Sequence, residues 1–214
     1  MFLDRKDAGE KLAENLNKFE NASNTVVMAI PYGGIIIGSI VADRLNIPFE
    51  MLIVRKLPLP YNSESGFGAV SEDGSVYIID EAAYMLPEND IRRIQAEQIE
   101  EVKKRKKMLR NNRELPELRG KTVILIDDGL AMGSTMRVAV CCCRFKRADR
   151  IVVAVPVAGE EVAGEFERLV DEVVVLEKPK NFRAVAQVYQ NWHDVSEEEA
   201  RATLRHYYFL NKSP

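Results

Sequence analysis

Residues 122–135 read TVILIDDGLAMGST, and this stretch decides the fold class. The apolar run at 122–126 is typical of a strand that is buried on both faces of a parallel sheet. Two carboxylates follow, Asp127 and Asp128, and then a loop of small residues opens a helical pattern at 134–145. Ligands of parallel α/β sheets bind beyond the carboxyl ends of the strands, so we expect a binding site directly after residue 126.

Strand and helix patterns alternate on both sides of this stretch. Further strands are predicted at 25–31, 49–56, 76–79, 151–157 and 172–176. Further helices are predicted at 4–19, 34–45, 87–110 and 160–170, with a capped C-terminal helix after Ser196. This order predicts an α/β fold, a parallel sheet flanked by helices with right-handed crossovers. For 214 residues we expect one domain, 1–214, with a helical tail at about 181–214.

The composition is that of a globular protein with a substantial core. Hydrophobic residues make up 46% and charged residues 29% of the chain. The net charge of −3 argues against nucleic-acid binding through bulk positive charge. Residues 21–42 carry no charge and are long enough to cross a bilayer, but Pro31-Tyr32-Gly33-Gly34 interrupts them. We therefore expect a cytoplasmic protein without a membrane segment, and the charged start at 1–6 shows no apolar signal core.

The three cysteines are consecutive, at Cys141, Cys142 and Cys143. Neighbours on a helix project about 100° apart, so the three thiols do not converge on one metal ion. We interpret them as small buried side chains in a reducing compartment.

The loop after the two acids has the features of a phosphate site. Backbone N–H groups at the start of a helix can bind phosphate, and the hydroxyls of Ser134 and Thr135 add donors. The carboxylates of Asp127 and Asp128 suit neighbouring sugar hydroxyls or a Mg²⁺ ion. The alternative is a Rossmann-like strand and turn with two exposed acids.

This motif resembles the signature of the type I phosphoribosyltransferases, which has four apolar residues, two acids and a loop ending in Thr-Gly-x-Thr. The resemblance covers most of the chain. It implies that the protein moves the 5-phosphoribosyl group from 5-phosphoribosyl-1-pyrophosphate (PRPP) to a nitrogenous base or amine, with Mg²⁺ as cofactor and release of pyrophosphate. By the resemblance, Asp127 and Asp128 hold the ribose 2′ and 3′ hydroxyls. Mg²⁺ binds through the substrate, and these two carboxylates are its candidate protein ligands.

The resemblance also implies which residues bind the 5′-phosphate. They are Ala131, Met132, Gly133, Ser134 and Thr135. Met132 stands where the family usually has Thr, so a hydroxyl donor is lost while the backbone donors remain.

The resemblance places pyrophosphate against two further segments. Tyr32, Gly33 and Gly34 form a loop that approaches pyrophosphate closely, where a Cβ would collide with the ligand. Many members carry Arg where Tyr32 stands and have a cis peptide in this loop, so a pyrophosphate cation is missing here. Arg55 and Lys56 supply cations for the leaving group. The alternatives are helix–sheet packing for Gly34 and solvated charges for Arg55 and Lys56.

The segment at 57–74 is rich in Pro, Gly and Ser and is longer than an ordinary connection. We interpret it as a long loop. The resemblance identifies the region at about 57–80 as a flexible hood, inserted after the second strand, that closes over substrate and excludes water. Glu64 and Glu72 are both available as general base, and the sequence does not decide between them.

The basic run at 103–107, KKRKK, leaves two functional classes open. Five successive helical positions point in all directions, which favours a solvated surface. A nucleic-acid site is the alternative, and the protein would then be a PRPP-sensing regulator on the same fold. Tyr189 and Trp192 are interpreted as C-terminal packing, and stacking on a base is the alternative.

The acceptor depends on one position. In 6-oxopurine salvage enzymes the third residue after the acid pair is an Asp, and Ala131 stands there in this chain. The pattern is closer to that of adenine phosphoribosyltransferases, so we expect hypoxanthine and guanine to be poor acceptors. A homodimer is the default for a protein of this kind.

Overall fold

The computed structural model describes residues 1–209, with the backbone alone at 63, 64, 206, 208 and 209. Residues 210–214 of the predicted tail lie outside it. The helices are α1 (Arg5–Asn15), α2 (Gly33–Leu45), α3 (Asp80–Ala83), α4 (Glu88–Arg110), α5 (Ser134–Phe145), α6 (Glu160–Glu167) and α7 (Glu197–Phe209). The strands are β1 (Thr25–Ala29), β2 (Phe49–Met51), β3 (Val54–Leu59), β4 (Asn62–Ser71), β5 (Val76–Ile78), β6 (Thr122–Ile126), β7 (Arg150–Val157) and β8 (Glu172–Glu177). Short 3₁₀ helices lie at Asn17–Phe19 and Val185–Val188.

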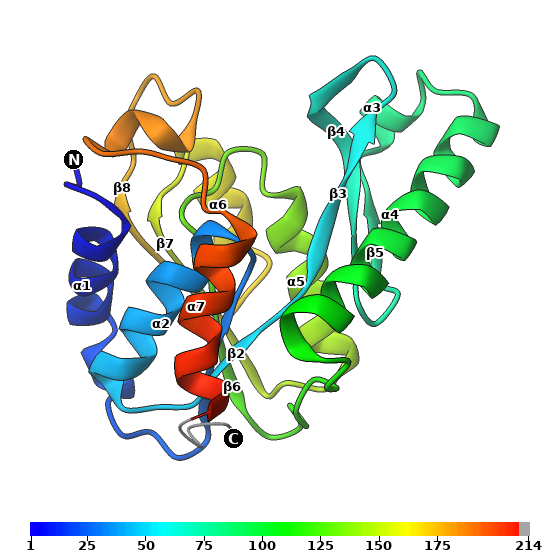
Figure 1. The fold of residues 1–214 in the computed structure, drawn as a ribbon. Helices are drawn as coiled ribbons and strands as arrows, with labels where there is room; N and C mark the ends of the chain where they lie inside the picture. The colour runs from blue at the N-terminus through cyan, green and yellow to red at the C-terminus, as the bar shows by residue number, and fades with distance from the viewer. Residues whose placement is uncertain (210–214) are drawn as a thin grey trace.

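The predicted parallel sheet is confirmed. Its strand order is β2-β1-β6-β7-β8, and all neighbouring pairs are parallel. Alternate residues face opposite layers: Val27 and Ile124 pack with α1 and α2, whereas Val26 and Val123 pack with α5 and α6. Figure 1 shows α7 beside α2 on the first of these layers. Burial on both faces explains why the strands are apolar throughout.

The helix ends follow local capping chemistry. The Asp4 carboxylate accepts a hydrogen bond from the Asp7 N–H at the start of α1, and the Ser196 hydroxyl accepts one from Glu199 at the start of α7. Helix α4 has Glu88 and Asp90 in its first turn and basic residues in its last, as its dipole favours. The predicted cap at Ser196 is confirmed.

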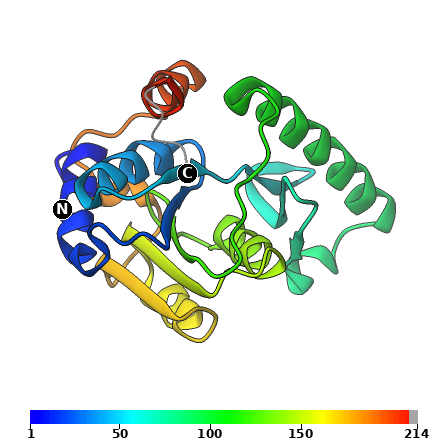
Figure 2. The same cartoon turned by 90° about the horizontal axis from the view of Figure 1, so that it is seen from below.

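The predicted loop at 57–74 is wrong, because this segment is a β-sheet. Strands β3, β4 and β5 form a three-stranded antiparallel sheet, and the single strand predicted at 49–56 is divided into β2 and β3. Figures 1 and 2 show this hood sheet with α4 on one side of the molecule. A Cβ at Gly68 would lie 2.2 Å from the Tyr77 carbonyl oxygen. The glycines that indicated a loop therefore permit close strand pairing.

The hood sheet is packed between two helices. Leu57 and Val70 belong to the core that includes Ile94 of α4, whereas Val54 and Ala69 belong to the core that includes α5. The strand alternation therefore gives the hood one apolar face for each helix. Helix α5 contacts both the hood sheet and β6 of the main sheet, whereas α4 contacts β3 and β4 of the hood sheet.

Two of the three cysteines are buried, as predicted, but Cys141 is exposed. Consecutive positions on α5 project about 100° apart, so one of the three faces solvent. Burial raises the pKa of Cys143 to about 12. Within residues 1–209, no helix combines the length and the apolar character that crossing a membrane requires.

Candidate functional site

The loops after β1 and β6 meet at the carboxyl edge of the main sheet. The two strands are parallel neighbours, with Ala29 opposite Ile126. The Ile30 N–H donates to the Ile126 carbonyl at 2.9 Å, which continues the pairing into the loops. The sheet thus brings the segment containing Tyr32 to the acid pair, although almost a hundred residues separate them in the chain.

The close approach of the loops after β1 and β6 requires glycine at the first two positions of α2. A Cβ at Gly33 would lie 1.8 Å from Asp128 Oδ2, and a Cβ at Gly34 would lie 2.7 Å from the Ile126 carbonyl oxygen. Both contacts are shorter than real Cβ contacts, so each position needs glycine even without a ligand. The packing alternative for Gly34 is supported, and Gly33 is fitted to the Asp128 carboxylate. The peptide between Pro31 and Tyr32 is cis, as the resemblance implies.

The predicted phosphate loop turns sharply into α5. The Leu130 N–H is bound to the Val157 carbonyl at 2.8 Å, and Gly133 has a φ of 74°, in the left-handed region that favours glycine. Helix α5 begins at Ser134, so the loop ends at backbone N–H groups without helical partners. Met132 is 58% exposed. Thr135 and Ser134 are half-buried at this helix start.

The acid pair lies in surroundings that disfavour its charge. Burial raises the pKa of Asp127 well above its usual range, and Asp128 adds to the rise. Asp127 Oδ1 accepts a hydrogen bond from the Asp128 N–H at 2.8 Å. Burial also raises the pKa of Asp128, while the guanidinium of Arg5 opposes that rise. The two carboxylates are half-buried beside glycines, and each can accept hydrogen bonds from donors of a ligand.

Arg5 is a site residue that the sequence prediction missed. Its Nε and Nη2 both donate to Asp128 Oδ2, at 3.0 and 2.9 Å, and its side chain is 7% exposed. A signal was present, because Arg5 shares the apolar face of α1 with Ala8 and Leu12 at helical spacing. A charge on a buried helix face needs a partner. That partner is one of the predicted site acids.

The C-terminal segment completes the surroundings of Asp128. The Trp192 ring centroid lies 3.9 Å from the Arg5 guanidinium carbon, and Arg5 Nη1 donates to the His193 carbonyl at 2.7 Å. The Tyr189 hydroxyl donates to the Asp128 carbonyl at 2.8 Å. The packing predicted for Tyr189 and Trp192 is present, with ring centroids 5.2 Å apart. This packing also holds the arginine that binds the acid.

The structure separates the two predicted strand cations. Arg55 faces α4, where its Nε donates to Gln98 Oε1 at 3.1 Å, and strand alternation directs Lys56 to the other face of the hood sheet. Burial lowers the pKa of Arg55, and nearby Arg105 lowers it further, whereas Glu101 and Tyr32 raise it. Arg55 is therefore on the Tyr32 side of the hood.

The basic run is less solvated than predicted. Lys103, Lys104 and Lys106 form ion pairs with glutamates, and Lys106 and Arg105 are half-buried. The Arg105 guanidinium carbon lies 4.6 Å from the centroid of the Tyr32 ring. One member of the run thus contacts a predicted site residue.

Glu72, a candidate general base, is a buried ion-pair partner. Its side chain is 2% exposed, it contacts Arg110, and its Oε1 accepts the Ile53 N–H at 3.0 Å. Burial raises its pKa and Arg110 opposes the rise. These contacts link Glu72, directly after β4, to Ile53 before β3 and to Arg110 at the end of α4. Glu64 lies outside the side chains that the structure describes.

Two cavities lie near these elements. One of about 660 Å³ opens beside Ala131 and is bounded by Glu160, Lys180 and Phe182. It lies between the predicted phosphate loop and α6.

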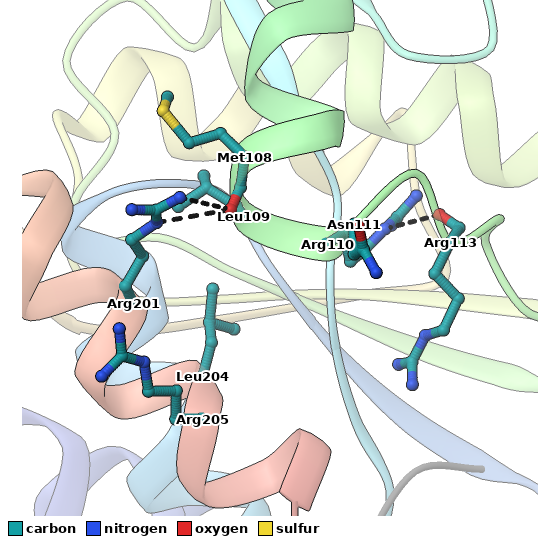
Figure 3. Close-up of a pocket in the computed structure, with 8 residues that line it drawn as sticks. All are labelled: Met108, Leu109, Arg110, Asn111, Arg113, Arg201, Leu204 and Arg205. Carbon is teal, nitrogen blue, oxygen red and sulfur yellow. Dashed lines mark hydrogen bonds between the residues drawn. The ribbon is translucent and has the colours of Figure 1, made fainter.

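The second cavity, of about 400 Å³, lies between the end of α4 and α7 (Figure 3). Its arginines are largely occupied by protein acceptors. Arg201 donates to the Met108 carbonyl at 3.0 Å, and Arg110 donates to the Met51 carbonyl at 2.8 Å. None of the predicted site residues lines this cavity, so it is separate from the acid pair.

Comparisons with known proteins show the family to which the chain belongs. The family described as the phosphoribosyl transferase domain matches residues 2–191. Over 206 residues the chain is 34% identical to a Mycobacterium tuberculosis protein named as a putative phosphoribosyl transferase, and the match covers 95% of this chain and 46% of that protein. The chain thus spans about half the length of the curated relatives it matches. The crystal structure of TT1426 from Thermus thermophilus covers 100% of both chains, with 33% identity and a TM-score of 0.80. With nearly its whole length matched by that family, the chain belongs to the phosphoribosyl transferase domain family.

Proposed function

We propose that this protein transfers the 5-phosphoribosyl group of PRPP to a nitrogenous acceptor and releases pyrophosphate, with Mg²⁺ as cofactor. One observation carries the proposal: Gly33 lies so close to Asp128 that a Cβ would reach within 1.8 Å of its carboxylate. The loop after β1 and the acid pair therefore share one edge of the sheet. PRPP has a sugar between two phosphate-bearing ends, so a single PRPP molecule could contact both the loop after β1 and the acid pair.

Each part of PRPP has a matching group at this edge. The carboxylates of Asp127 and Asp128 would accept hydrogen bonds from the ribose hydroxyls, which are neutral donors. The N–H groups after Gly133, at the start of α5, would bind the 5′-phosphate, aided by the helix dipole. Because Met132 is largely exposed, its substitution for Thr removes a hydroxyl without blocking these backbone donors.

The donor set fits a Mg²⁺ ion that is bound largely by substrate. Among the side chains that the structure describes, no cluster of three or more His, Cys, Asp or Glu could hold a metal ion alone. Mg²⁺ commonly takes one or two carboxylates and completes its shell with phosphate oxygens and water. Asp127 and Asp128 would be those carboxylates, and the ion would neutralise charge on the leaving pyrophosphate.

The chain's own contribution is positioning and charge stabilisation. The bond from the anomeric carbon to pyrophosphate breaks while a bond to the acceptor nitrogen forms on the opposite face, through an oxocarbenium-like state. Arg55 would stabilise the leaving charge from the hood. The hood would also keep water from the reactive carbon.

A PRPP-sensing regulator that binds nucleic acid is the second candidate. It rests on the basic run, and glutamate ion pairs neutralise three of the five charges there, those of Lys103, Lys104 and Lys106.

Incubation with PRPP, Mg²⁺ and a panel of bases and amines separates the two. We expect pyrophosphate release that depends on an acceptor. PRPP binding without release for any acceptor, together with salt-sensitive nucleic-acid binding, would favour the regulator.

A further inference from the structure

Arg105 contacts the loop after β1, the loop that the resemblance places against pyrophosphate. Arg105 belongs to α4, but its guanidinium carbon lies 4.6 Å from the centroid of the Tyr32 ring. Tyr32 directly precedes the two glycines that lie against the acid pair. A planar guanidinium over an aromatic face is a favourable arrangement that fixes the direction of the side chain. The hood helix thus delivers a cation to the loop after β1.

Arg55 and Arg105 form a pair of like charges. Arg105 is close enough to lower the pKa of Arg55, which is itself half-buried. The bond from Arg55 to Gln98 is to a neutral acceptor. Glu101 is bound to Lys104, which lowers the pKa of Glu101, and it lies near enough to Arg55 and Arg105 for their charges to lower that pKa further. In the part of the chain whose side chains the structure describes, no carboxylate forms an ion pair with Arg55 or Arg105. Glu101 offsets part of the repulsion between the two guanidinium groups, and an anion bound to both of them would offset the rest.

We propose that Arg105 and Arg55 together bind the pyrophosphate group of PRPP, with the Tyr32 ring positioning Arg105. This inference rests on the proposed function. Two planar guanidinium groups can each donate two hydrogen bonds to phosphate oxygens. Many family members carry an arginine where Tyr32 stands in this chain. Arg105 would supply the missing positive charge from α4.

The rest of the basic run serves as an internal comparison. Lys103, Lys104 and Lys106 are paired with glutamates, whereas Lys107 is exposed in the last turn of α4. Lys107 is therefore a matched control for the loss of one positive charge from the same run.

The test compares ligands that differ by the pyrophosphate group. Calorimetry would measure binding of PRPP with Mg²⁺, and of ribose 5-phosphate, to the wild type and to Arg105→Gln, Arg105→Lys and Lys107→Gln. We expect Arg105→Gln to weaken PRPP binding about tenfold to a hundredfold, the scale of a charge-assisted hydrogen bond, and to leave ribose 5-phosphate unchanged. The PRPP affinity of Arg105→Lys should lie between those of the wild type and Arg105→Gln, because lysine keeps the charge but lacks the paired donors of the guanidinium group. Lys107→Gln should bind both ligands normally.

Three outcomes would overturn the inference in distinguishable ways. Normal PRPP binding by Arg105→Gln would remove Arg105 from the site and leave the proposed function standing. Equal weakening of both ligands in Arg105→Gln and Arg105→Lys would show a structural role for the residue. Failure of the folded wild type to bind either ligand would reject the proposed function, and the inference with it.

Discussion

The Arg5 guanidinium donates two hydrogen bonds to a single carboxylate oxygen of Asp128, 123 residues away in the chain. The pair is shielded from solvent, with side chains 7% and 16% exposed. Arg5 therefore orients one of the two acids proposed to bind ribose, and it also favours the charged form of that acid. Asp128 remains able to accept a ligand through its other oxygen.

Replacing Arg5 should destabilise the protein and weaken PRPP binding. Arg5→Met leaves a buried carboxylate without its cation, which costs about 3 kcal/mol in the free energy of unfolding. Lys11→Met is the matched control on α1, because Lys11 pairs with Asp7 at 2.7 Å in an exposed setting and should cost less than about 1 kcal/mol. Urea unfolding at neutral pH measures both. Equal losses in the two variants would refute a special role for the Arg5 pair.

The raised pKa of Asp127 predicts that Asp127→Asn stabilises the folded protein increasingly as pH rises. Because the folded pKa is raised, the unfolded chain ionises this group first as pH climbs above the ordinary value of 3.8. The contribution of the group to stability is complete below that value and is lost as pH rises through the folded pKa. The free energy of unfolding of Asp127→Asn, relative to wild type, should therefore increase from pH 4 to pH 8. A difference that stays constant or falls across this range would contradict the assigned shift.

Gly33→Ala should displace the Asp128 carboxylate, because the new Cβ would lie 1.8 Å from its Oδ2. We expect loss of both thermal stability and PRPP affinity. Gly164→Ala in α6 is the control, since a Cβ there has nothing within 4 Å and alanine is the better helix former. Thermal unfolding of the two variants should move in opposite directions. A Gly33→Ala protein that matches wild type in stability and binding would show that the two loops do not meet as described.

The main sheet was predictable because its signals are local. Continuous apolar runs such as 122–126, and the breaker at 31–34, mark the strands and turns that surround the acid pair. The hood sheet was not predictable, because its strands contain Pro, Gly and Ser, which usually indicate loops. Those residues are explained only by the pairing of β4 with Tyr77 and by packing against α4 and α5.

The missing parts of the candidate site are also long-range contacts. Arg5 reaches Asp128 across the sheet, and Arg105 reaches Tyr32 from the hood helix. A single sequence shows which residues carry charge and which helix face they share. It does not show which distant charge they meet.

The acceptor preference follows from Ala131. Its methyl group cannot accept a proton, so general-base catalysis of about 10²- to 10⁴-fold is not available from this loop position. We expect kcat/KM with hypoxanthine or guanine to be lower than with the preferred acceptor of the panel. Ala131→Asp should raise activity with these two bases if the position alone limits them. A wild type that prefers hypoxanthine or guanine over every other acceptor would refute this inference and require a base from elsewhere in the protein.

The most direct test of the central claim is PRPP binding by the variant carrying both Asp127→Asn and Asp128→Asn. Amides are weaker acceptors for the ribose hydroxyls and poorer partners for Mg²⁺ than carboxylates. Calorimetric titration with PRPP and Mg²⁺, after circular dichroism has established that the variant is folded, should show binding for the wild type and loss of it for the variant. A folded variant that binds PRPP as tightly as the wild type would contradict the account.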